Sequence, residues 1–504
     1  MNGRQSPFSA TMTEDGDFPG LSGKRNLIVI LNWRDRVHPQ AGGAEVVCER
    51  LAEQFVGRGW NVRFLCAHVK GHPRTEVRDG YTVVRRGKRF TVYPRLLFWL
   101  LLHRRQVAGV VDSQNGIPFF SPLVLPRRTP ILLLLHHIHQ EQFSSYFPRP
   151  IATVGRWLES FGCRTVYGKR TVVAVSPSTR SGARKNLKLR GNICVIPSGW
   201  TIAGTTAGGL PRRATNPTVV SVGRLVPHKR QLLLIEAAAG LIGRMPDLAV
   251  HIVGSGPEHA RLQSRVVTLG LQRNVRFHQS LSNQQRDELI ASSWLVVLPS
   301  QGEGWGLTVL EANALGVPAV AFRVPGLRDS IVAGETGWLL ESVGDLAEGV
   351  AKALDELRDE ARALEIADST RAWAARFTWE SMADRYRCVL EAEARRLRIG
   401  HHDRRSQSDI VTVVRAPRSV LMAWPGRQVR RTDIWHISDD EFGLLLHGAD
   451  TSDAQALLTE VGLTADETAL ASTRVARSVH LLHPGFGRSA EHVSQPREQQ
   501  RPTA

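Results

Sequence analysis

The sequence has no apolar run long enough to cross a bilayer. Its longest apolar stretches, residues 96–102 and 131–135, fall far short of the roughly 18 to 20 residues that a spanning helix needs. Residues 1–23 are rich in Ser, Gly, Pro and Asp and lack a basic start followed by an apolar segment, so they do not resemble a secretory signal. We therefore expect a disordered tail over 1–23 and a cytoplasmic protein.

Cysteine is scarce, with five residues in 504. They stand far apart, with no CxxC pair and no His/Cys spacing typical of a zinc site. This argues against a disulfide framework and a structural metal, and it favours buried thiols in a reducing compartment. We expect neither a metal nor a cofactor.

Acidic residues are outnumbered by basic ones, 47 to 65, which gives a net charge of +18 and an isoelectric point near 10.6. A positive net charge is compatible with binding to nucleic acid, to an anionic membrane surface or to phosphorylated substrates. It is equally compatible with an Arg-rich surface that is merely solvated. Zinc-finger, RNP and bZIP patterns are all missing, so we expect no nucleic-acid partner.

Short apolar runs alternate with helical segments from residue 26 to about 391. A composition rich in Gly, Thr, Pro and Arg at 199–217 interrupts the pattern and reads as a linker. The interpretation is an α/β protein with two doubly wound halves, 24–200 and 201–375, each with a parallel sheet covered on both faces. Because such sheets bind ligands at the carboxyl ends of their strands, the two halves would share one cleft.

Residues 376–400 are predicted to form a terminal helix that packs back toward the first half. Residues 401–504 form an extension of unknown role, partly disordered, in which 452–462 has the start and stop signals of a helix.

The motif AGGAE at 41–45 follows the first strand and opens the first helix. Gly42 and Gly43 allow close backbone approach, and a helix start directs free N–H groups at an anion. The pattern suits a phosphate, although the same sequence also forms plain structural turns. It is neither a Walker loop nor a three-glycine dinucleotide fingerprint.

A second motif, GRLVPHK at 223–229, ends the first strand of the second half. Arg224 offers a planar fork for phosphate oxygens and Lys229 a point charge. Together they could offset the charge of a departing diphosphate. The alternative interpretation is that Arg224 and Lys229 are simply solvent-exposed basic residues before a helix, with no role in binding.

A third motif runs from Glu303 to Glu311. The two carboxylates could accept hydrogen bonds from vicinal hydroxyls, one on a sugar and the other on a ribose. Gly304 and Gly306 would let the N-terminus of the next helix reach a phosphate.

The sequence HHIH at 136–139 directly follows an apolar strand, and DSQNGIP at 112–118 ends another. Since adjacent strand residues point to opposite faces, we do not expect a metal site at 136–139. His137, His139 and Asn115 are weak candidates for contacts with an acceptor. Residues 93–105, apolar and basic together, fit either a buried helix or contact with an anionic membrane surface.

These motifs resemble glycosyltransferase family 4, the retaining enzymes of the GT-B fold. The resemblance covers about 26–395 and is carried by AGGAE (41–45), GRLVPHK (223–229), VGSGPE (253–258), NVRFH (274–278) and PSQGEGWGLTVLEANALGVPAVA (299–321). It implies a hexosyltransferase that uses a nucleotide diphosphate sugar, retains configuration and acts in glycan or glycolipid biosynthesis.

The resemblance also implies roles for individual residues. Glu303 would contact the donor sugar and Glu311 the ribose, while Arg224 and Lys229 hold the diphosphate. A His at the end of the 131–135 strand would face the anomeric carbon; His136 matches best, and His137 and His139 remain open. The catalytic set is then His136, Glu303, Arg224 and Lys229. The donor-binding set adds Gly42, Gly43, Gly304, Trp305, Gly306, Leu307 and Glu311.

Where the family usually has Phe, this chain has Trp305, which is expected to alter donor fit only slightly. Two other classes remain as alternatives: a non-catalytic scaffold that kept the fold, and a nicotinamide-dependent oxidoreductase. The oxidoreductase needs a three-glycine fingerprint that the sequence lacks. The donor sugar, its base, the acceptor and the oligomeric state are left open.

Overall fold

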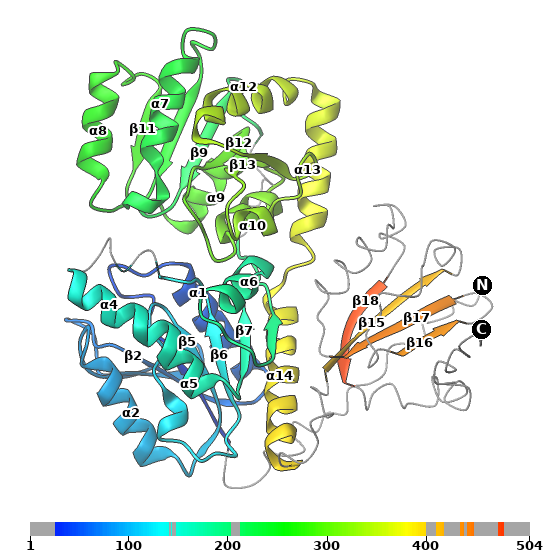
Figure 1. Ribbon diagram of the computed structural model, residues 1–504. Coiled ribbons are helices and arrows are strands. Elements are labelled where there is room, and N and C mark those ends of the chain that lie inside the picture. The colour runs from blue at the N-terminus through cyan, green and yellow to red at the C-terminus, as the bar shows by residue number, and fades with distance from the viewer. Residues whose placement is uncertain are drawn as a thin grey trace, which may run out of the picture.

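The computed structural model describes residues 26–140, 143, 148–202, 212–399, 410–417, 434–437, 441–447 and 472–477. The predicted tail over 1–23, the predicted helix over 452–462 and residues 203–211 of the predicted linker lie outside these residues. The described chain forms two α/β halves, a long helix that joins them, and a small antiparallel sheet (Figure 1).

The first half is built on an eight-stranded sheet of order β3-β4-β2-β1-β5-β6-β7-β8. Its strands are β1 (Leu27–Leu31), β2 (Asn61–Cys66), β3 (Thr75–Arg78), β4 (Tyr81–Arg85), β5 (Val107–Gln114), β6 (Ile131–Leu135), β7 (Thr171–Ala174) and β8 (Ile193–Val195). Its helical segments are α1 (Gly43–Gly57), α2 (Val92–His103), η1 (Ser121–Leu123), α4 (Arg149–Trp157), η2 (Leu158–Gly162), α5 (Cys163–Tyr167) and α6 (Pro177–Lys185).

Strand β3 corrects the prediction of a wholly parallel sheet. Thr75–Arg78 pairs antiparallel with β4 at the edge, whereas the other described pairings of this sheet are parallel. The segment is half exposed and reads TEVR, so it has no apolar run to reveal a strand. An edge strand needs only one hydrogen-bonding neighbour and one buried face, which explains why so polar a segment can occupy it.

The apolar runs of the central strands serve both faces of this sheet. In β1, Ile28 and Ile30 belong to the core shared with α1 and α14, while Leu27, Val29 and Leu31 belong to the core under α2, α5 and α6. This alternation is the period of two expected for a strand covered on both sides. It confirms the doubly wound interpretation of the first half.

The second half has a six-stranded parallel sheet of order β11-β10-β9-β12-β13-β14. Its strands are β9 (Thr218–Val222), β10 (Ala249–Val253), β11 (Val275–His278), β12 (Leu295–Leu298), β13 (Ala319–Phe322) and β14 (Gly337–Leu340). Its helical segments are η3 (Pro227–Lys229), α7 (Gln231–Leu241), α8 (His259–Thr268), α9 (Asn283–Ser292), α10 (Leu307–Ala314), α11 (Leu327–Ser330), η4 (Val343–Asp345), α12 (Leu346–Glu356) and α13 (Glu360–Ala374).

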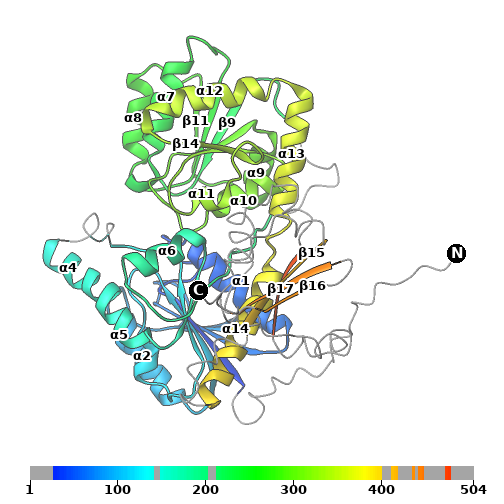
Figure 2. The same cartoon turned by 45° about the vertical axis from the view of Figure 1, so that its right-hand side comes forward.

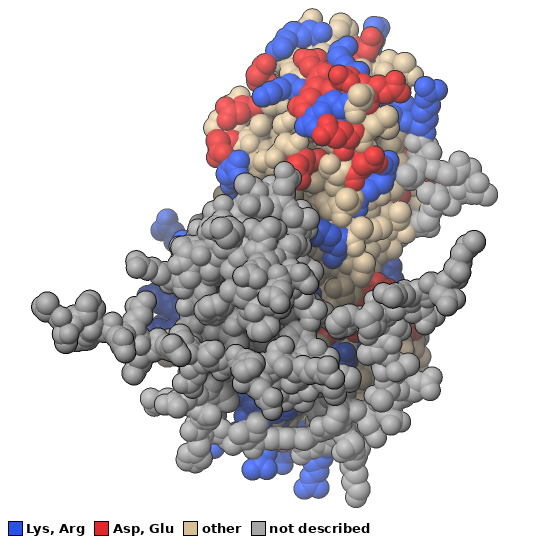
Figure 3. All heavy atoms as spheres, turned by 90° about the vertical axis from the view of Figure 1, so that its right-hand side faces the viewer, with Lys and Arg blue, Asp and Glu red and all other residues tan. Residues whose placement is uncertain are grey.

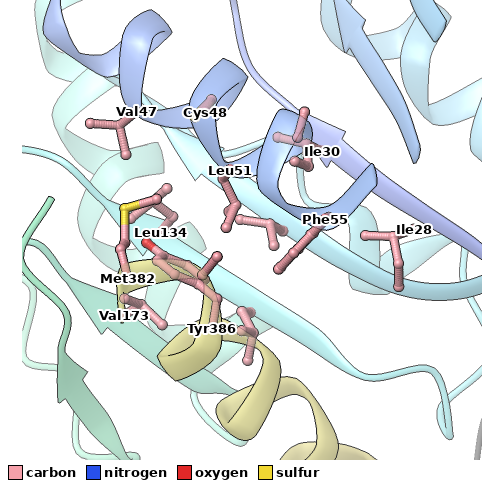
Figure 4. Packing of buried hydrophobic residues seen from close by; sticks show 14 of the residues in the cluster. Ile28, Ile30, Val47, Cys48, Leu51, Phe55, Leu134, Val173, Met382 and Tyr386 are labelled. Atoms are coloured by element: carbon pink, nitrogen blue, oxygen red, sulfur yellow. The ribbon is translucent and has the colours of Figure 1, made fainter. Parts of the chain in front are cut away.

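Helix α14 (Trp379–Ile399) leaves the second half and packs on the first. Figure 4 shows Met382 and Tyr386 of α14 against the buried face of the first-half sheet, where Leu51 and Phe55 of α1 also lie. Burying a large apolar side chain contributes about 1.5 to 3 kcal/mol, so this helix adds substantially to the first-half core.

The chain passes between the halves twice, at residues 199–201 and 374–379, and the two passages are bonded to each other. The Trp200 indole donates to the Ala374 carbonyl at 2.7 Å, and the Trp379 indole donates to Thr201 Oγ1 at 2.6 Å. A Cβ on Gly199 would lie 2.5 Å from the Trp379 nitrogen, so only glycine allows this approach.

The extension contains four strands in the order β16-β17-β15-β18, all paired antiparallel. They are β15 (Ile410–Pro417), β16 (Ile434–Ile437), β17 (Glu441–His447) and β18 (Ser472–Arg477). Both views place this sheet beside α14, on the side opposite α4 (Figures 1 and 2).

Candidate active site

The Gly42–Gly43 loop is fixed by Glu45. Gly42 caps α1 with extended backbone, and its N–H donates to Glu45 Oε2 at 2.7 Å. The carboxylate is 1% exposed and also accepts from Arg34 Nε at 3.2 Å and from Asn115 Nδ2 at 3.1 Å. Asn115, predicted to contact an acceptor, is thus bonded to the carboxylate that holds this loop.

The loop that carries Arg224 rests on the second glycine-rich segment, VGSGPE. Gly223 N donates to the Val253 carbonyl and Leu225 N to the Ser255 carbonyl, each at 2.9 Å. A Cβ on Gly254 would lie 2.0 Å from the Gly223 oxygen, so the two loops can pack this closely only because Gly254 has no side chain.

Lys229 and Glu303 form an ion pair at the base of this loop. Ser300 Oγ also donates to Glu303 Oε1 at 2.8 Å. Burial opposes ionisation of Glu303, but the Lys229 ammonium and the two hydrogen bonds outweigh it and bring the pKa of the carboxyl below its ordinary value. Glu303 is therefore a carboxylate at neutral pH, able to accept bonds from hydroxyl groups.

Glu311, unlike Glu303, has no close ion pair with a lysine or arginine side chain in the described structure. It lies in the second turn of α10, and its nearest cation is Arg286, with Nη2 3.9 Å from Oε1. Burial raises the pKa of Glu311 to about 7, although Arg286 acts in the opposite direction. At the start of the same helix Gly306 has φ of 95°, a left-handed conformation that favours glycine and turns the chain into α10.

The two halves meet at the predicted site residues. A Cβ built on Gly42 would lie 3.7 Å from Arg224 Nε, and one on Gly43 would lie 2.9 Å from Leu307 Cδ1. A Cβ on Gly304 would lie only 2.1 Å from the His136 carbonyl oxygen. The structure therefore brings the Gly42–Gly43 loop, Arg224 and the start of α10 together.

Beside these contacts, α6 and α11 tie the halves directly. Ser178 N donates to Asp329 Oδ2 at 3.0 Å, and Arg328 Nε donates to Ser178 Oγ at 2.9 Å. Thr179 Oγ1 donates to the Gly304 carbonyl at 3.4 Å.

The imidazole of His136 is turned into the first half. Its Nε2 lies 3.0 Å from Ser113 Oγ and 3.6 Å from Cys48 Sγ, and the residue is 8% exposed. Burial, together with the charge of His139, lowers the pKa of His136 to about 3, so the ring is neutral at physiological pH. What His136 presents to the second half is its backbone carbonyl.

The ring of His137 faces the second half. A Cβ on Gly302 would lie 3.7 Å from its Cε1, and the Glu303 backbone and carboxylate lie close enough to influence its ionisation. Burial and then His139 lower the pKa of His137 to about 4. Of the three histidines left open by the sequence, His137 is the one whose side chain reaches the Glu303 loop.

His139 is tied to Glu159, in the π-helical turn η2. Glu159 is fully buried; it accepts from the His139 backbone N–H at 2.7 Å and from the Gln140 side chain at 2.6 Å, and lies 3.6 Å from His139 Nδ1. The rings of His137 and His139 are 5.4 Å apart, edge to face. Glu159 thus sets the path of the whole histidine loop.

Trp305 does not present its ring to the open part of the site. It is 5% exposed, and its ring packs on Phe377 with centroids 5.2 Å apart, within the core shared by the first half and α14. Any influence of Trp305 on donor fit therefore passes through the loop backbone.

Sequence reasoning missed Glu45 and Glu159 as parts of the site. Glu45 had a local signal, because a helix cap followed three residues later by Glu is the pattern of a capping box. Glu159 had none, since its partners lie about 20 residues earlier in the chain. Within the described ranges, no group of three or more His, Cys, Asp or Glu residues is arranged to hold a metal ion.

Two doubly wound α/β domains that meet at glycine-rich loops, with a final helix returning to the first domain, are typical of the GT-B fold. Residues 41–202 match the model of Glycosyltransferase Family 4, and residues 208–373 match that of Glycosyl transferases group 1. The chain belongs to glycosyltransferase family 4.

Among curated relatives, a D-inositol 3-phosphate glycosyltransferase of Corynebacterium urealyticum is 34% identical over 170 residues, which are 32% of this chain and 40% of the relative. An uncharacterized glycosyltransferase of Haemophilus influenzae is 26% identical over 69% of this chain and 96% of its own length. The match to the Corynebacterium urealyticum protein therefore spans less than half of that protein's length.

Among solved structures, the Anabaena protein HepE in complex with UDP and glucose superposes with a TM-score of 0.56 at 19% identity, over 73% of this chain and 99% of that one. At this level of identity the likeness concerns the fold.

Proposed function

We propose that the protein transfers a hexose from a nucleotide diphosphate sugar to an acceptor, with retention of configuration. The observation that carries the proposal is the meeting of Arg224 and the start of α10 with the Gly42–Gly43 loop of the opposite half. The adjoining loop, in which Glu303 pairs with Lys229, meets the histidine loop of the same half. Guanidinium, ammonium and free N–H groups at one place are what a diphosphate needs.

The donor would bind mainly to the second half. Arg224, Lys229 and the N–H groups near Gly306 would stabilise the charge that develops on the departing diphosphate. Glu303, ionised beside Lys229, would accept hydrogen bonds from sugar hydroxyls, and Glu311 would do so from the ribose. The complex of HepE with UDP and glucose supports this class of ligand for the fold.

We infer retention from the resemblance to glycosyltransferase family 4. The surroundings of Glu45 bear on the route and not on the stereochemical outcome, because they argue against a covalent glycosyl intermediate. Glu45, the carboxylate beside Gly42, is buried and accepts bonds from Gly42, Arg34 and Asn115, so it cannot reach an anomeric carbon as a nucleophile. The acceptor hydroxyl would then attack on the face that the diphosphate leaves, with the neutral His137 close to that face. Contact between the halves excludes water that would hydrolyse the donor.

The acceptor would be a sugar, a lipid or another small molecule bound by the first half. The protein would work in the cytoplasm or peripherally on the inner face of the membrane. The relative named as a D-inositol 3-phosphate glycosyltransferase makes a phosphorylated polyol the first acceptor to test.

The test has two stages. A thermal-shift screen with uridine, guanosine and adenosine diphosphate sugars identifies the donor, since a ligand at a hundred times its Kd stabilises by about 2.7 kcal/mol. Glu311→Ala should remove the shift, whereas Glu288→Ala, on the neighbouring helix α9, should keep it.

Release of nucleotide from that donor, with NMR of the product's anomeric configuration, then tests the reaction. A product of inverted configuration would refute retention. Donor binding without turnover, against every acceptor class above, would favour the scaffold alternative, and nicotinamide reduction would favour the oxidoreductase.

A further inference from the structure

Most of the large apolar side chains exposed in the described residues lie on one part of the first half. On α2 these are Phe98, Leu101 and Leu102; Leu123 is in η1; on α4 and η2 they are Ile151, Val154, Trp157 and Phe161. Several are far from covered, with Leu102 65%, Phe98 61% and Trp157 54% exposed. We call this set the α2–α4 surface.

The positions on each helix follow the helical period. Leu101 and Leu102 follow Phe98 by three and four residues. Ile151, Val154 and Trp157 follow one another at intervals of three, and Phe161 comes four residues later. The buried side of α2, with Leu96 and Leu100, packs on the first-half sheet, so the exposed stripe is a second apolar face on the same helix. Figures 1 and 2 both show α2, α4 and α5 side by side on one side of this half.

Among the described residues, the exposed charges around this surface have one sign. Exposed cations on and between these elements are Arg95, Arg104, Arg105, Arg127, Arg128, Arg149, Arg164 and Lys169. The acidic residues described between 86 and 170 are Asp112 and Glu159, and both are buried, each accepting hydrogen bonds inside the fold. The face of the second half in Figure 3 instead mixes acidic and basic side chains.

We propose that the α2–α4 surface docks on an anionic lipid bilayer. Its aromatic and aliphatic side chains would enter the boundary between head groups and acyl chains, while the arginines contact lipid phosphates. No helix in the described part of the chain has the length and apolarity to cross a bilayer, so this contact would be peripheral.

The charge pattern and the exposed apolar side chains favour a lipid bilayer over two other partners, a second copy of the chain and a nucleic acid. A second copy of the chain would bring two positively charged surfaces together, which Coulomb repulsion disfavours. A nucleic acid would match the charge but not the protruding Leu, Ile and Val side chains, which cannot stack on bases in the way that aromatic platforms do.

The surface is also joined to the candidate active site. Helix α4 continues into η2, where Glu159 holds the His139 N–H and the Gln140 side chain. If the proposed transferase activity holds, a lipid-linked acceptor in the bilayer would lie close to the histidine loop. The docking itself does not depend on that activity.

The test is co-sedimentation of the full chain with vesicles of phosphatidylcholine alone and of phosphatidylcholine with phosphatidylglycerol at 7:3. The wild type should bind the mixed vesicles and not the neutral ones, more weakly as salt is raised. Phe98→Ser with Trp157→Ser should lower the partition coefficient at least tenfold. The matched control is Val267→Ser with Leu364→Ser, whose side chains in the second half are 61% and 60% exposed and should not matter.

A charge reversal tests the electrostatic contribution to the proposed docking. Arg104→Glu with Arg105→Glu should abolish binding to mixed vesicles, while the equal reversal at Arg273 and Arg276, exposed in the second half, should reduce it far less. No binding by the wild type, or equal loss in both reversals, would overturn the proposal. So would a dimer in sedimentation velocity that Phe98→Ser with Trp157→Ser dissociates, since a second copy would then cover the surface.

Nucleotide release from the donor in solution separates this proposal from the proposed function. It should be unchanged in all four double variants. Vesicle binding without sugar transfer would support the docking surface and contradict the proposed transferase activity.

Discussion

Replacing Gly304 by alanine should block the approach of the two halves. The added Cβ would lie 2.1 Å from the His136 carbonyl oxygen and 3.3 Å from Val175 Cγ2, and both atoms belong to the first half. Since such contacts are essentially never shorter than 3.0 Å, the halves would have to separate by about 1 Å. A displacement of that size at a reacting centre can cost roughly 100-fold in rate.

Gly302→Ala is the matched control. It lies two residues earlier in the same loop, and its Cβ would make an ordinary contact of 3.7 Å with His137 Cε1. We expect nucleotide release and sugar transfer to fall about 100-fold in Gly304→Ala and less than threefold in Gly302→Ala. The melting temperatures should stay equal, because the clash is between the halves. Transfer by Gly304→Ala at nearly the wild-type rate would refute the assigned contact.

Three further outcomes can be checked. The pKa of Glu311, raised to about 7 by burial, means that the folded state holds a proton that the unfolded state has lost. Stability should therefore fall between pH 4.5 and 7, by about 3 kcal/mol relative to Glu311→Gln in urea unfolding. Tyr386→Phe removes a buried hydroxyl with no partner among the described residues and should be neutral or stabilising, whereas Tyr167→Phe, which deprives Asp112 of a donor, should cost about 1 to 3 kcal/mol in the same assay. Glu159→Gln should lower kcat about tenfold with little change in the donor KM, because it perturbs the histidine loop and leaves the second half intact; an unchanged kcat would contradict its positioning role.

The fold could be predicted largely because its strands are buried on both faces. Runs such as Ile131–Leu135 and Leu295–Leu298 are continuously apolar and bounded by helical segments, which is typical of doubly wound sheets. The edge strand Thr75–Arg78 was missed because half of it meets solvent and its residues do not separate it from a loop.

The residues that we propose for donor binding could be picked out by their motifs, but their protonation states could not. Glu303 and Glu311 are both glutamates in one motif, yet Lys229 holds the first ionised and burial raises the pKa of the second. Likewise, the sequence could not say which histidine faces the second half. The strand ends at Leu135, and beyond it the alternation of faces no longer decides side-chain direction.

The bonded pair of passages between the halves constrains how they can move. Because Trp200 is bonded to Ala374, and Trp379 to Thr201, the two connections act at one point rather than at two separated ones. Rotation about that point can open the site at the far ends of the sheets, whereas sliding one half past the other would break both indole bonds and pull Gly199 from Trp379. An opening for substrate exchange that keeps both indole bonds would therefore be a swing about this point, after which the same glycines return to the same neighbours.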